Sequence, residues 1–347
     1  MALDFWCPST AQATGYGRVH FCLYRALKKL GAKLTDDPGA GDITVFYGQP
    51  GIEAPLRKLW RVRTKAKFLF YCMFECSVPP KGWVDVLEGR LPGVQPVDGL
   101  LVPSTWCGEM FRENGVTCPI HVVPHGIGPE EFPILERDPE RPFTFLWQGV
   151  VPNDRKGAWL VREAFESLGY VDTRLVLKWW NQQSPRGFYW KDNDKRIEHI
   201  GLKLSDPDML NLLRRCDCSV NPTSGEGFGL IPLEHAATGM ATMVTNWSGP
   251  ADYATHVGMW CLTPIMKPSV FGGQIGLDAV DATVSLHEMR GNMAWCAENR
   301  ESALKMGRNV AERIHKSWTW RHAAERLIAA CATHVPRETI MGAQDAQ

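Results

Sequence analysis

Short apolar runs alternate with helix-length segments along the whole chain, and this alternation predicts an α/β fold built on parallel sheets. In the first part of the chain, a helix is predicted over 18–30, because Gly31 is a typical residue to end it. The apolar runs there predict strands at 3–6, 43–47, 68–74, 99–103 and 120–123.

A second series of elements follows a proline-rich stretch at 124–142, which is typical of a connection between domains. Its strands are predicted at 143–147, 174–178, 197–200, 218–221 and 241–245. Its helices are predicted at 158–168, 206–214 and 226–238, with helical segments over 285–331. We therefore expect two doubly wound, Rossmann-like domains, residues 1–135 and 136–316, followed by a C-terminal segment, 317–347. Such domains bind a ligand in a cleft at the carboxyl ends of their strands.

Length and charge narrow the class of partner. The 347 residues suffice for two domains of roughly 150–170 residues each. Hydrophobic residues make up 44% of the chain and charged residues 22%, as in ordinary globular proteins. The formal net charge is zero, so no overall field attracts a polyanion, and any basic binding surface has to be local.

The eleven cysteines do not form the frame of a metal site. Cys72 and Cys76 are close in sequence, as are Cys216 and Cys218, but neither pair has a second pair downstream. Their odd number favours reduced thiols, as in a cytoplasm. The N-terminus lacks a basic region followed by an apolar run, and no stretch approaches the roughly 18 apolar residues that cross a bilayer. We expect a cytoplasmic protein that is soluble or at most peripheral.

The segment with the most chemical information runs from Asn221 to Glu234 and reads NPTSGEGFGLIPLE. A predicted strand ends at Asn221, a glycine-rich turn follows, and a helix is expected to begin near Phe228. Unpaired backbone N–H groups at a helix start form a seat for an anion such as a diphosphate, and the glycines let the backbone approach it. Glu226 would lie at the mouth of the turn and Glu234 about two helical turns further along the same face. The alternative is that Glu226 only caps the helix and Glu234 is a solvated surface charge. The residues expected at this seat are Glu226, Gly227, Phe228, Gly229, Leu230 and Glu234.

A second segment ends in Arg155-Lys156-Gly157, shortly after the predicted strand at 143–147. A lysine at a helix start beside a diphosphate can neutralise the charge of a leaving group. The alternative for Lys156 is an exposed cation at a helix start.

These motifs resemble the retaining GT-B glycosyltransferases of glycosyltransferase family 4. Glu226 and Glu234 have the family's E-x7-E spacing, and the resemblance extends in the right order over about residues 12–330. Further segments that carry it are 101–106, 121–127, 245–253 and 317–320. It implies a GT-B fold, with two Rossmann-like domains facing a central cleft and a final helix that crosses back to the first domain.

The resemblance also implies a mechanism. The first glutamate lies against the donor sugar, and the second binds the ribose hydroxyls. Lys156 and the amides near Gly227 and Phe228 stabilise the departing phosphate, which takes the proton of the acceptor, and no metal or other cofactor is needed. Family members usually place an arginine directly after the strand's glycine, where this chain has Val150. The second phosphate-binding cation is therefore either missing or supplied by Arg155.

In the first domain, Gly15-Tyr16-Gly17-Arg18 opens the first long helix. It is a poor dinucleotide fingerprint, because His20 occupies the third glycine position. By resemblance, Gly15, Tyr16 and Gly17 reach the donor phosphates, and Arg18 either joins them or is an exposed helix residue. Glu75 is expected at the carboxyl end of the strand at 68–74, where it would orient an acceptor hydroxyl or act as a loop charge or N-cap. His125 is expected to be structural rather than catalytic.

A basic run at 57–67 places six cations in eleven residues. It can meet nucleic-acid phosphates or an anionic membrane, or form a solvated helix face. Two acceptors fit. One is a hydroxymethylated pyrimidine in DNA, as in phage genome-modifying transferases, which would place the enzyme in a host cytoplasm; the other is a cell-surface glycan or lipid. The acceptor-binding candidates are Arg57, Lys58, Trp60, Arg61 and Arg63.

The donor expected from the resemblance is a nucleotide sugar, a UDP-linked hexose. Other functions are compatible with the same scaffold: a non-hydrolysing sugar-nucleotide epimerase, a sugar phosphorylase, a nicotinamide oxidoreductase without the usual fingerprint, or a non-catalytic nucleic-acid-binding or scaffold protein. The presence of both Glu226 and Glu234 argues against the last of these.

Overall fold

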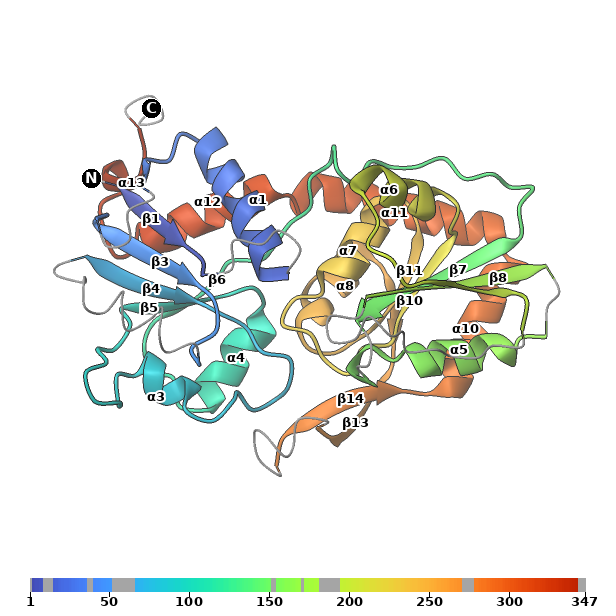
Figure 1. The fold of residues 1–347 in the computed structure, drawn as a ribbon, viewed down its shortest axis with the longest axis horizontal. Coiled ribbons are helices and arrows are strands. Elements are labelled where there is room, and N and C mark those ends of the chain that lie inside the picture. The colour runs from blue at the N-terminus through green and yellow to red at the C-terminus, as the bar shows by residue number, and fades with distance from the viewer. Residues whose placement is uncertain are drawn as a thin grey trace. The chain divides into compact units, whose positions relative to one another are not determined.

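The computed structural model describes residues 2–8, 15–35, 40–51, 66–150, 154–169, 172–180, 194–269 and 278–342. The chain forms two compact units, each with its own parallel sheet (Figure 1). Unit 1 comprises Met1–Gly126, Gly273–Ala279 and Trp318–Gln347. Unit 2 comprises Ile127–Gly272 and Val280–Ser317.

The sheet of unit 1 has six parallel strands in the order β2-β1-β3-β4-β5-β6. These strands are β1 (Leu3–Trp6), β2 (Leu34–Thr35), β3 (Ile43–Tyr47), β4 (Lys67–Tyr71), β5 (Gly99–Val102) and β6 (Ile120–Val122). Helices α1 (Gly15–Lys29) and α12 (Trp320–Cys331) pack side by side over one face, and α3 (Trp83–Leu87) and α4 (Thr105–Glu113) lie over the other (Figure 1). A short helix, α13 (Arg337–Ile340), ends the described chain. The last long helix thus belongs to unit 1 although it follows unit 2 in sequence.

The sheet of unit 2 has six parallel strands in the order β12-β11-β10-β7-β8-β9. They are β7 (Phe143–Val150), β8 (Thr173–Trp180), β9 (Ile197–Ile200), β10 (Cys218–Asn221), β11 (Ala241–Thr245) and β12 (Trp260–Leu262). An antiparallel ribbon of β13 (Pro264–Pro268) and β14 (Val280–Val284) is attached to this unit.

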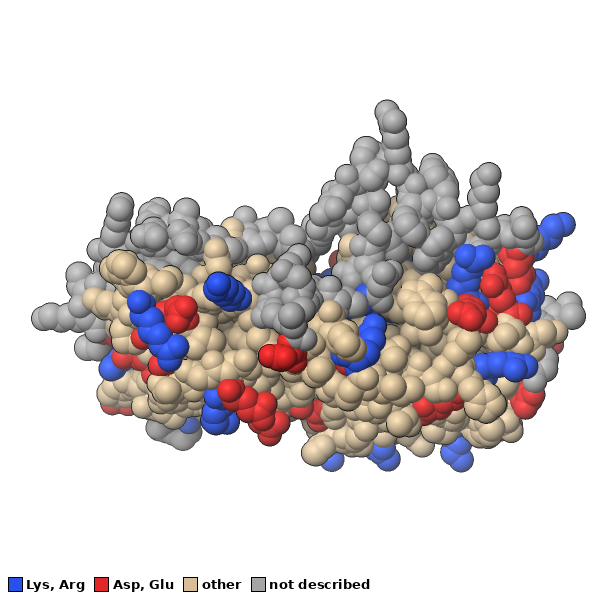
Figure 2. All heavy atoms as spheres, turned by 90° about the horizontal axis from the view of Figure 1, so that it is seen from below, with Lys and Arg blue, Asp and Glu red and all other residues tan. Residues whose placement is uncertain are grey.

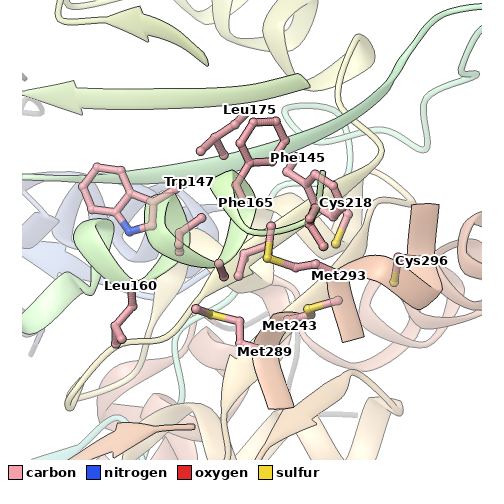
Figure 3. Packing of buried hydrophobic residues seen from close by; sticks show 14 of the residues in the cluster. Phe145, Trp147, Leu160, Phe165, Leu175, Cys218, Met243, Met289, Met293 and Cys296 are labelled. Atoms are coloured by element: carbon pink, nitrogen blue, oxygen red, sulfur yellow. The ribbon is translucent and has the colours of Figure 1, made fainter. Parts of the chain in front are cut away.

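Helices cover both faces of the second sheet (Figure 1). One layer consists of α5 (Ala158–Glu166) and α10 (Leu286–Glu298), and the other of α6 (Asp206–Arg214), α7 (Leu230–Ala237), α8 (Gly249–Val257) and α11 (Arg300–Ser317). Figure 3 shows the core under α5 and α10, where Phe145, Trp147 and Leu175 of the strands meet Phe165 and Met289 of the helices. Alternate residues of these strands therefore face this core, and the residues between them face the α7 layer.

The predicted α/β class with two parallel-sheet domains is confirmed. The strands at 3–6, 43–47, 197–200, 218–221 and 241–245 and the helix at 206–214 have the predicted bounds. The predicted strand 68–74 was too long, since β4 ends at Tyr71 although the apolar run continues. Strands β7 and β8 are longer than predicted, because polar Gln148 and Lys178 end the apolar runs but not the ladder.

Charged side chains of both signs are interspersed over the face drawn in Figure 2, in line with the zero net charge. All eleven cysteines are free thiols. Among the described helices, none combines the length and the apolar character that crossing a bilayer requires.

Candidate active site

The glycine-rich turn of unit 2 joins β10 to α7 and lies at the carboxyl edge of the sheet. Helix α7 begins at Leu230, after Gly229, whose φ of 87° is in the left-handed region that favours glycine. The predicted helix start at 226 is therefore wrong, and Glu226, Gly227 and Phe228 belong to the turn. Glu226 and Glu234 do not share a helical face, contrary to the prediction.

Glu226 is held between two cations. Nζ of Lys156 donates a hydrogen bond to Oε1 of Glu226, and Nη1 of Arg155 lies 3.2 Å from the same oxygen. The three side chains are only 9–14% exposed. Burial raises the pKa of Glu226, but the charges of Arg155 and Lys156 outweigh it and bring the pKa below its usual value. Glu226 is therefore ionised at neutral pH.

The backbone after β7 fixes both cations against the turn. Residues Asp154–Lys156 form one 3₁₀ turn, and the amide of Ser224 donates to the carbonyl of Arg155 at 2.7 Å. Nε1 of the buried Trp147 donates to the carbonyl of Lys156 at 2.8 Å. The following position, 157, has to be glycine, because its φ is 67° and a Cβ there would lie 2.5 Å from the carbonyl oxygen of Pro222.

Arg155 is largely occupied by these contacts. Besides its ion pair with Glu226, its Nη1 donates to the carbonyl of Gly225, and the residue is 8% exposed. Val150, at the position where the family resemblance leads one to expect arginine, is exposed. Arg155 thus positions the turn and Glu226.

The loop after β11 supports the turn from the other side. Oγ of Ser248 accepts a hydrogen bond from the amide of Glu226 at 3.0 Å, and the amide of Gly249 donates to the carbonyl of Glu226 at 2.9 Å. Ser248 has a φ of 57°, a conformation that costs a non-glycine residue about 1–3 kcal/mol. Gly249 is required because a Cβ there would lie 2.4 Å from the carbonyl oxygen of Gly227. The amide of Glu226 is consequently engaged by Ser248.

Tyr253 of α8 connects the turn to α7. Its hydroxyl donates to the carbonyl of Gly229 at 2.7 Å, and its ring lies 5.2 Å from that of Phe228. Burial raises the pKa of Tyr253, and the charges of Glu226 and Glu234 raise it further. The two glutamates thus lie near the same phenol, although one is in the turn and the other in the helix.

A buried polar network below the turn was not predicted from the sequence. Nδ1 of His235 lies 2.7 Å from Oγ of Ser219, and its Nε2 lies 3.2 Å from Oε1 of Gln148. Asn221 Nδ2 donates to the same Ser219 hydroxyl at 2.9 Å. Burial lowers the pKa of His235 to about 3, so the ring is neutral. A consistent assignment has Ser219 donating to Nδ1 and Nε2–H donating to Gln148. The network ties α7 to β10 and β7.

In unit 1, Glu75 lies four residues beyond the end of β4 rather than at the predicted strand end. Burial raises the pKa of Tyr16, in the first turn of α1, and Glu75 raises it further, so this carboxylate lies near the phenol. Tyr16 also forms a hydrogen bond with Gln49. The structure thus brings Glu75 to Tyr16 at the carboxyl edge of the first sheet, beside Gly15 and Gly17 of the same helix.

His125 follows β6 and is 3% exposed. Its Nε2 lies 3.4 Å from the hydroxyl of Tyr47, and its ring contacts those of Tyr71 and Trp320. Burial lowers its pKa to about 3, so this ring is also neutral.

Arg57, Lys58, Trp60, Arg61 and Arg63 lie outside the described residues. Lys67, the last cation of the basic run, is described and pairs with Asp98 at 2.9 Å. In the part of the chain that is described, no group of three or more histidine, cysteine or acidic side chains is placed to hold a metal ion.

Known proteins resemble this chain in part of its sequence and in its fold. Residues 192–327 match a sequence family described as Family 4 Glycosyltransferase in conflict systems. No protein with a curated function matches the chain in sequence.

Solved GT-B structures match the fold over most of the chain. Anabaena HepE in complex with UDP has a TM-score of 0.69 at 12% identity and covers 96% of this chain and 100% of its own. A glycosyltransferase from Rickettsia africae has a TM-score of 0.66 at 12% identity, with coverages of 96% and 98%. Sucrose-phosphate synthase from Thermosynechococcus elongatus has a TM-score of 0.56 at 11% identity, with coverages of 84% and 73%. The expected GT-B fold is confirmed.

Proposed function

We propose that this chain is a glycosyltransferase that moves a hexose from a uridine-diphosphate sugar to an acceptor hydroxyl, with retention of anomeric configuration and without a metal. The observation that carries the proposal is the ion-paired group of Arg155, Lys156 and Glu226 at the glycine-rich turn, with Glu234 on the helix that follows. The family 4 match over residues 192–327 supports sugar transfer. The UDP in the HepE structure supports a uridine donor.

In this proposal, Lys156 exchanges part of its contact with Glu226 for an oxygen of the donor diphosphate. The bond between the anomeric carbon and the phosphate oxygen breaks as the acceptor oxygen bonds to that carbon, and the departing phosphate takes the acceptor's proton. Lys156 stabilises the negative charge that develops on the leaving oxygen. Glu226 lies against the sugar, and Glu234 accepts hydrogen bonds from the ribose hydroxyls.

By the resemblance, Gly15, Tyr16 and Gly17 of unit 1 bind the donor phosphates. In unit 2, the turn residues Gly227, Phe228, Gly229 and Leu230 bind the donor. Glu75 orients the acceptor hydroxyl, for which its position beside the Tyr16 phenol provides a polar neighbour.

For the acceptor we propose a hydroxymethylated pyrimidine in DNA. The basic run at 57–67 is the supporting observation, since cations interleaved with Trp60 suit a nucleic-acid backbone. A glycan or lipid acceptor is the competing hypothesis. Reversing charge at Arg61 and Arg63 separates them: transfer to hydroxymethylated DNA should fall, and transfer that is unchanged contradicts the DNA-reading role.

The proposed function is tested by incubating the chain with a panel of nucleotide sugars, with and without acceptors, and analysing products by mass spectrometry. We expect acceptor-dependent release of a nucleoside diphosphate, with the sugar attached to the acceptor. Epimerised donor without transfer would instead identify an epimerase, and no turnover with any donor would contradict an enzymatic role.

A further inference from the structure

Lys178 of β8 is a buried cation that the account above does not use. It is 5% exposed, and its Nζ donates one hydrogen bond, to the carbonyl of Trp179 at 3.3 Å. An ammonium has three N–H donors, so this single contact leaves most of its hydrogen-bonding capacity unmet among the described residues. Burial lowers the pKa of Lys178, as expected of a charge removed from water, and among the described residues no anion offsets this shift.

The strand register places Lys178 two residues before the carboxyl end of β8, near the edge that carries the turn between β10 and α7. Lys178 is aligned with Gln148 of β7, one residue before the pair Gly149 and Trp179. A Cβ on Gly149 would lie 3.2 Å from Cβ of Lys156 and 2.6 Å from the ring of Trp147, so Lys156 begins beyond this row on the Trp147 face of the sheet. Neighbouring strands are about 4.8 Å apart, and the two lysines start from opposite faces of the sheet near its carboxyl edge.

Lys178 and Gln148 face the same layer. Leu177 and Trp147 point into the core under α5 and α10, so their neighbours Lys178 and Gln148 point to the α7 side. Gln148 confirms this direction by its contact with His235 of α7. His235 occupies Oε1 of Gln148, so the side-chain N–H groups of Gln148 remain as donors. The ammonium of Lys178 and the carboxamide of Gln148 are therefore two donors on adjacent strands.

Charge balance calls for another cation at this edge. The charges of Arg155, Lys156, Glu226 and Glu234 cancel, while each phosphate of a donor diphosphate carries a negative charge. Arg155 is committed to Glu226 and to the carbonyl of Gly225. Val150 supplies no charge where the resemblance leads one to expect arginine. A buried ammonium costs free energy until an anion compensates it, so an anionic ligand recovers that cost on binding.

We propose that Lys178, with Gln148 beside it, is the second phosphate-binding cation of the donor site. It takes the place of the arginine that is absent at 150 and binds the diphosphate from the α7 side, while Lys156 binds it from the α5 side. The inference rests on the proposed function, because the anion is the diphosphate of the donor.

The test uses UDP as the probe and the full chain with three substitutions: Lys178→Met, Lys178→Arg and, on the exposed face of α11, the control Lys305→Met. Binding of UDP and of uridine is measured by calorimetry or competition, and the melting temperature is measured without ligand. Methionine keeps an unbranched side chain out to Cε and removes the ammonium group.

We expect Lys178→Met to weaken UDP binding by roughly 10–100-fold, the usual effect of losing a charged hydrogen-bonding partner. Uridine binding should change less than threefold, and Lys178→Arg should recover a part of the UDP affinity. The melting temperature of the ligand-free protein should stay the same or rise with Lys178→Met, because an uncompensated buried charge is removed. Lys305→Met should match the parent.

Two results overturn the inference while the proposed function stands: UDP affinity that is unchanged in Lys178→Met, or equal losses of UDP and uridine binding with a lower melting temperature, which indicate a structural lysine. A parent chain that does not bind UDP overturns both proposals.

Discussion

The two sheets have the same architecture, yet their carboxyl edges carry different chemistry. In unit 2 this edge holds the charged residues Arg155, Lys156 and Glu226, with Lys178 below them. In unit 1 the corresponding edge holds the aromatic residues Tyr16, Tyr47 and Tyr71, with neutral His125. The repeated fold provides the position, and residues at strand ends decide what is bound there. The edge of unit 2 suits a diphosphate, whereas at the edge of unit 1 Tyr16 and Glu75 are partly exposed and Tyr47 and Tyr71 are fully buried.

The largest effect should come from the charged edge. We expect Lys156→Met and Glu226→Gln each to lower sugar transfer by about a hundredfold to a thousandfold, because each removes a charge that acts on the reacting donor. The rate is measured by release of nucleoside diphosphate. Glu312→Gln, at an exposed position of α11, is the matched control. Activity within a few fold of the parent in Lys156→Met would contradict the role of this edge.

The next effect concerns the support of the turn. Gly249→Ala forces a Cβ against the carbonyl of Gly227 and should lower the free energy of unfolding by about 3 kcal/mol, together with donor affinity. Gly291→Ala in α10 is the control, because a Cβ there meets no atom within 4 Å. Alanine should stabilise that exposed helical position by about 0.5–1 kcal/mol. Urea denaturation measures both, and equal effects would show that the close approach at Gly249 is not rigid.

Each edge contains a buried neutral histidine, and both should make the fold sensitive to acid. The pKa of His235 and of His125 is lowered to about 3, whereas an unfolded histidine titrates near pH 6.5. Their contribution to stability is therefore present above pH 6.5 and is lost as the pH falls towards 3. Each should cost about 2 kcal/mol by pH 5.

His235→Gln and His125→Gln test this comparison, with exposed His256→Gln as the control. The difference in unfolding free energy between each variant and the parent should shrink between pH 7 and pH 5. A constant difference for one variant would mean that its histidine has the same pKa in the folded and unfolded states.

The smallest effect should come from the aromatic edge. Glu75→Gln should lower the catalytic efficiency towards the acceptor by about tenfold through loss of a positioning charge, with donor affinity unchanged. Steady-state kinetics with each substrate varied in turn separates the two. A loss of donor affinity would contradict this role and would assign Glu75 to donor binding instead.

The sequence predicted the sheets better than the turn. Apolar runs marked most strand bounds because buried parallel strands are continuously apolar. The predicted strands at 143–147 and 174–178 ended too early, because the polar residues Gln148 and Lys178 interrupt the apolar runs while β7 and β8 continue. The helix start at 226 was wrong because three alternating glycines fit both a turn and a helix start. The left-handed Gly229 is visible only in three dimensions.

Sequence spacing brought out Lys156, Glu226 and Glu234 but not their supports. Ser248 and His235 act through contacts with residues 16–87 positions away, and no local pattern encodes such a distance. A signal was nonetheless present: Gln148, Ser219 and Asn221 are polar residues at alternate positions of otherwise apolar strands, and His235 lies in an apolar helix.

A crystal structure of the chain with bound UDP tests the central claim most directly. The account predicts phosphate oxygens within about 3 Å of Nζ of Lys156 at the turn between β10 and α7, with the ribose at Glu234. UDP bound away from this turn would contradict the account. So would a complex in which Lys156 still pairs with Glu226 and no phosphate lies beside it.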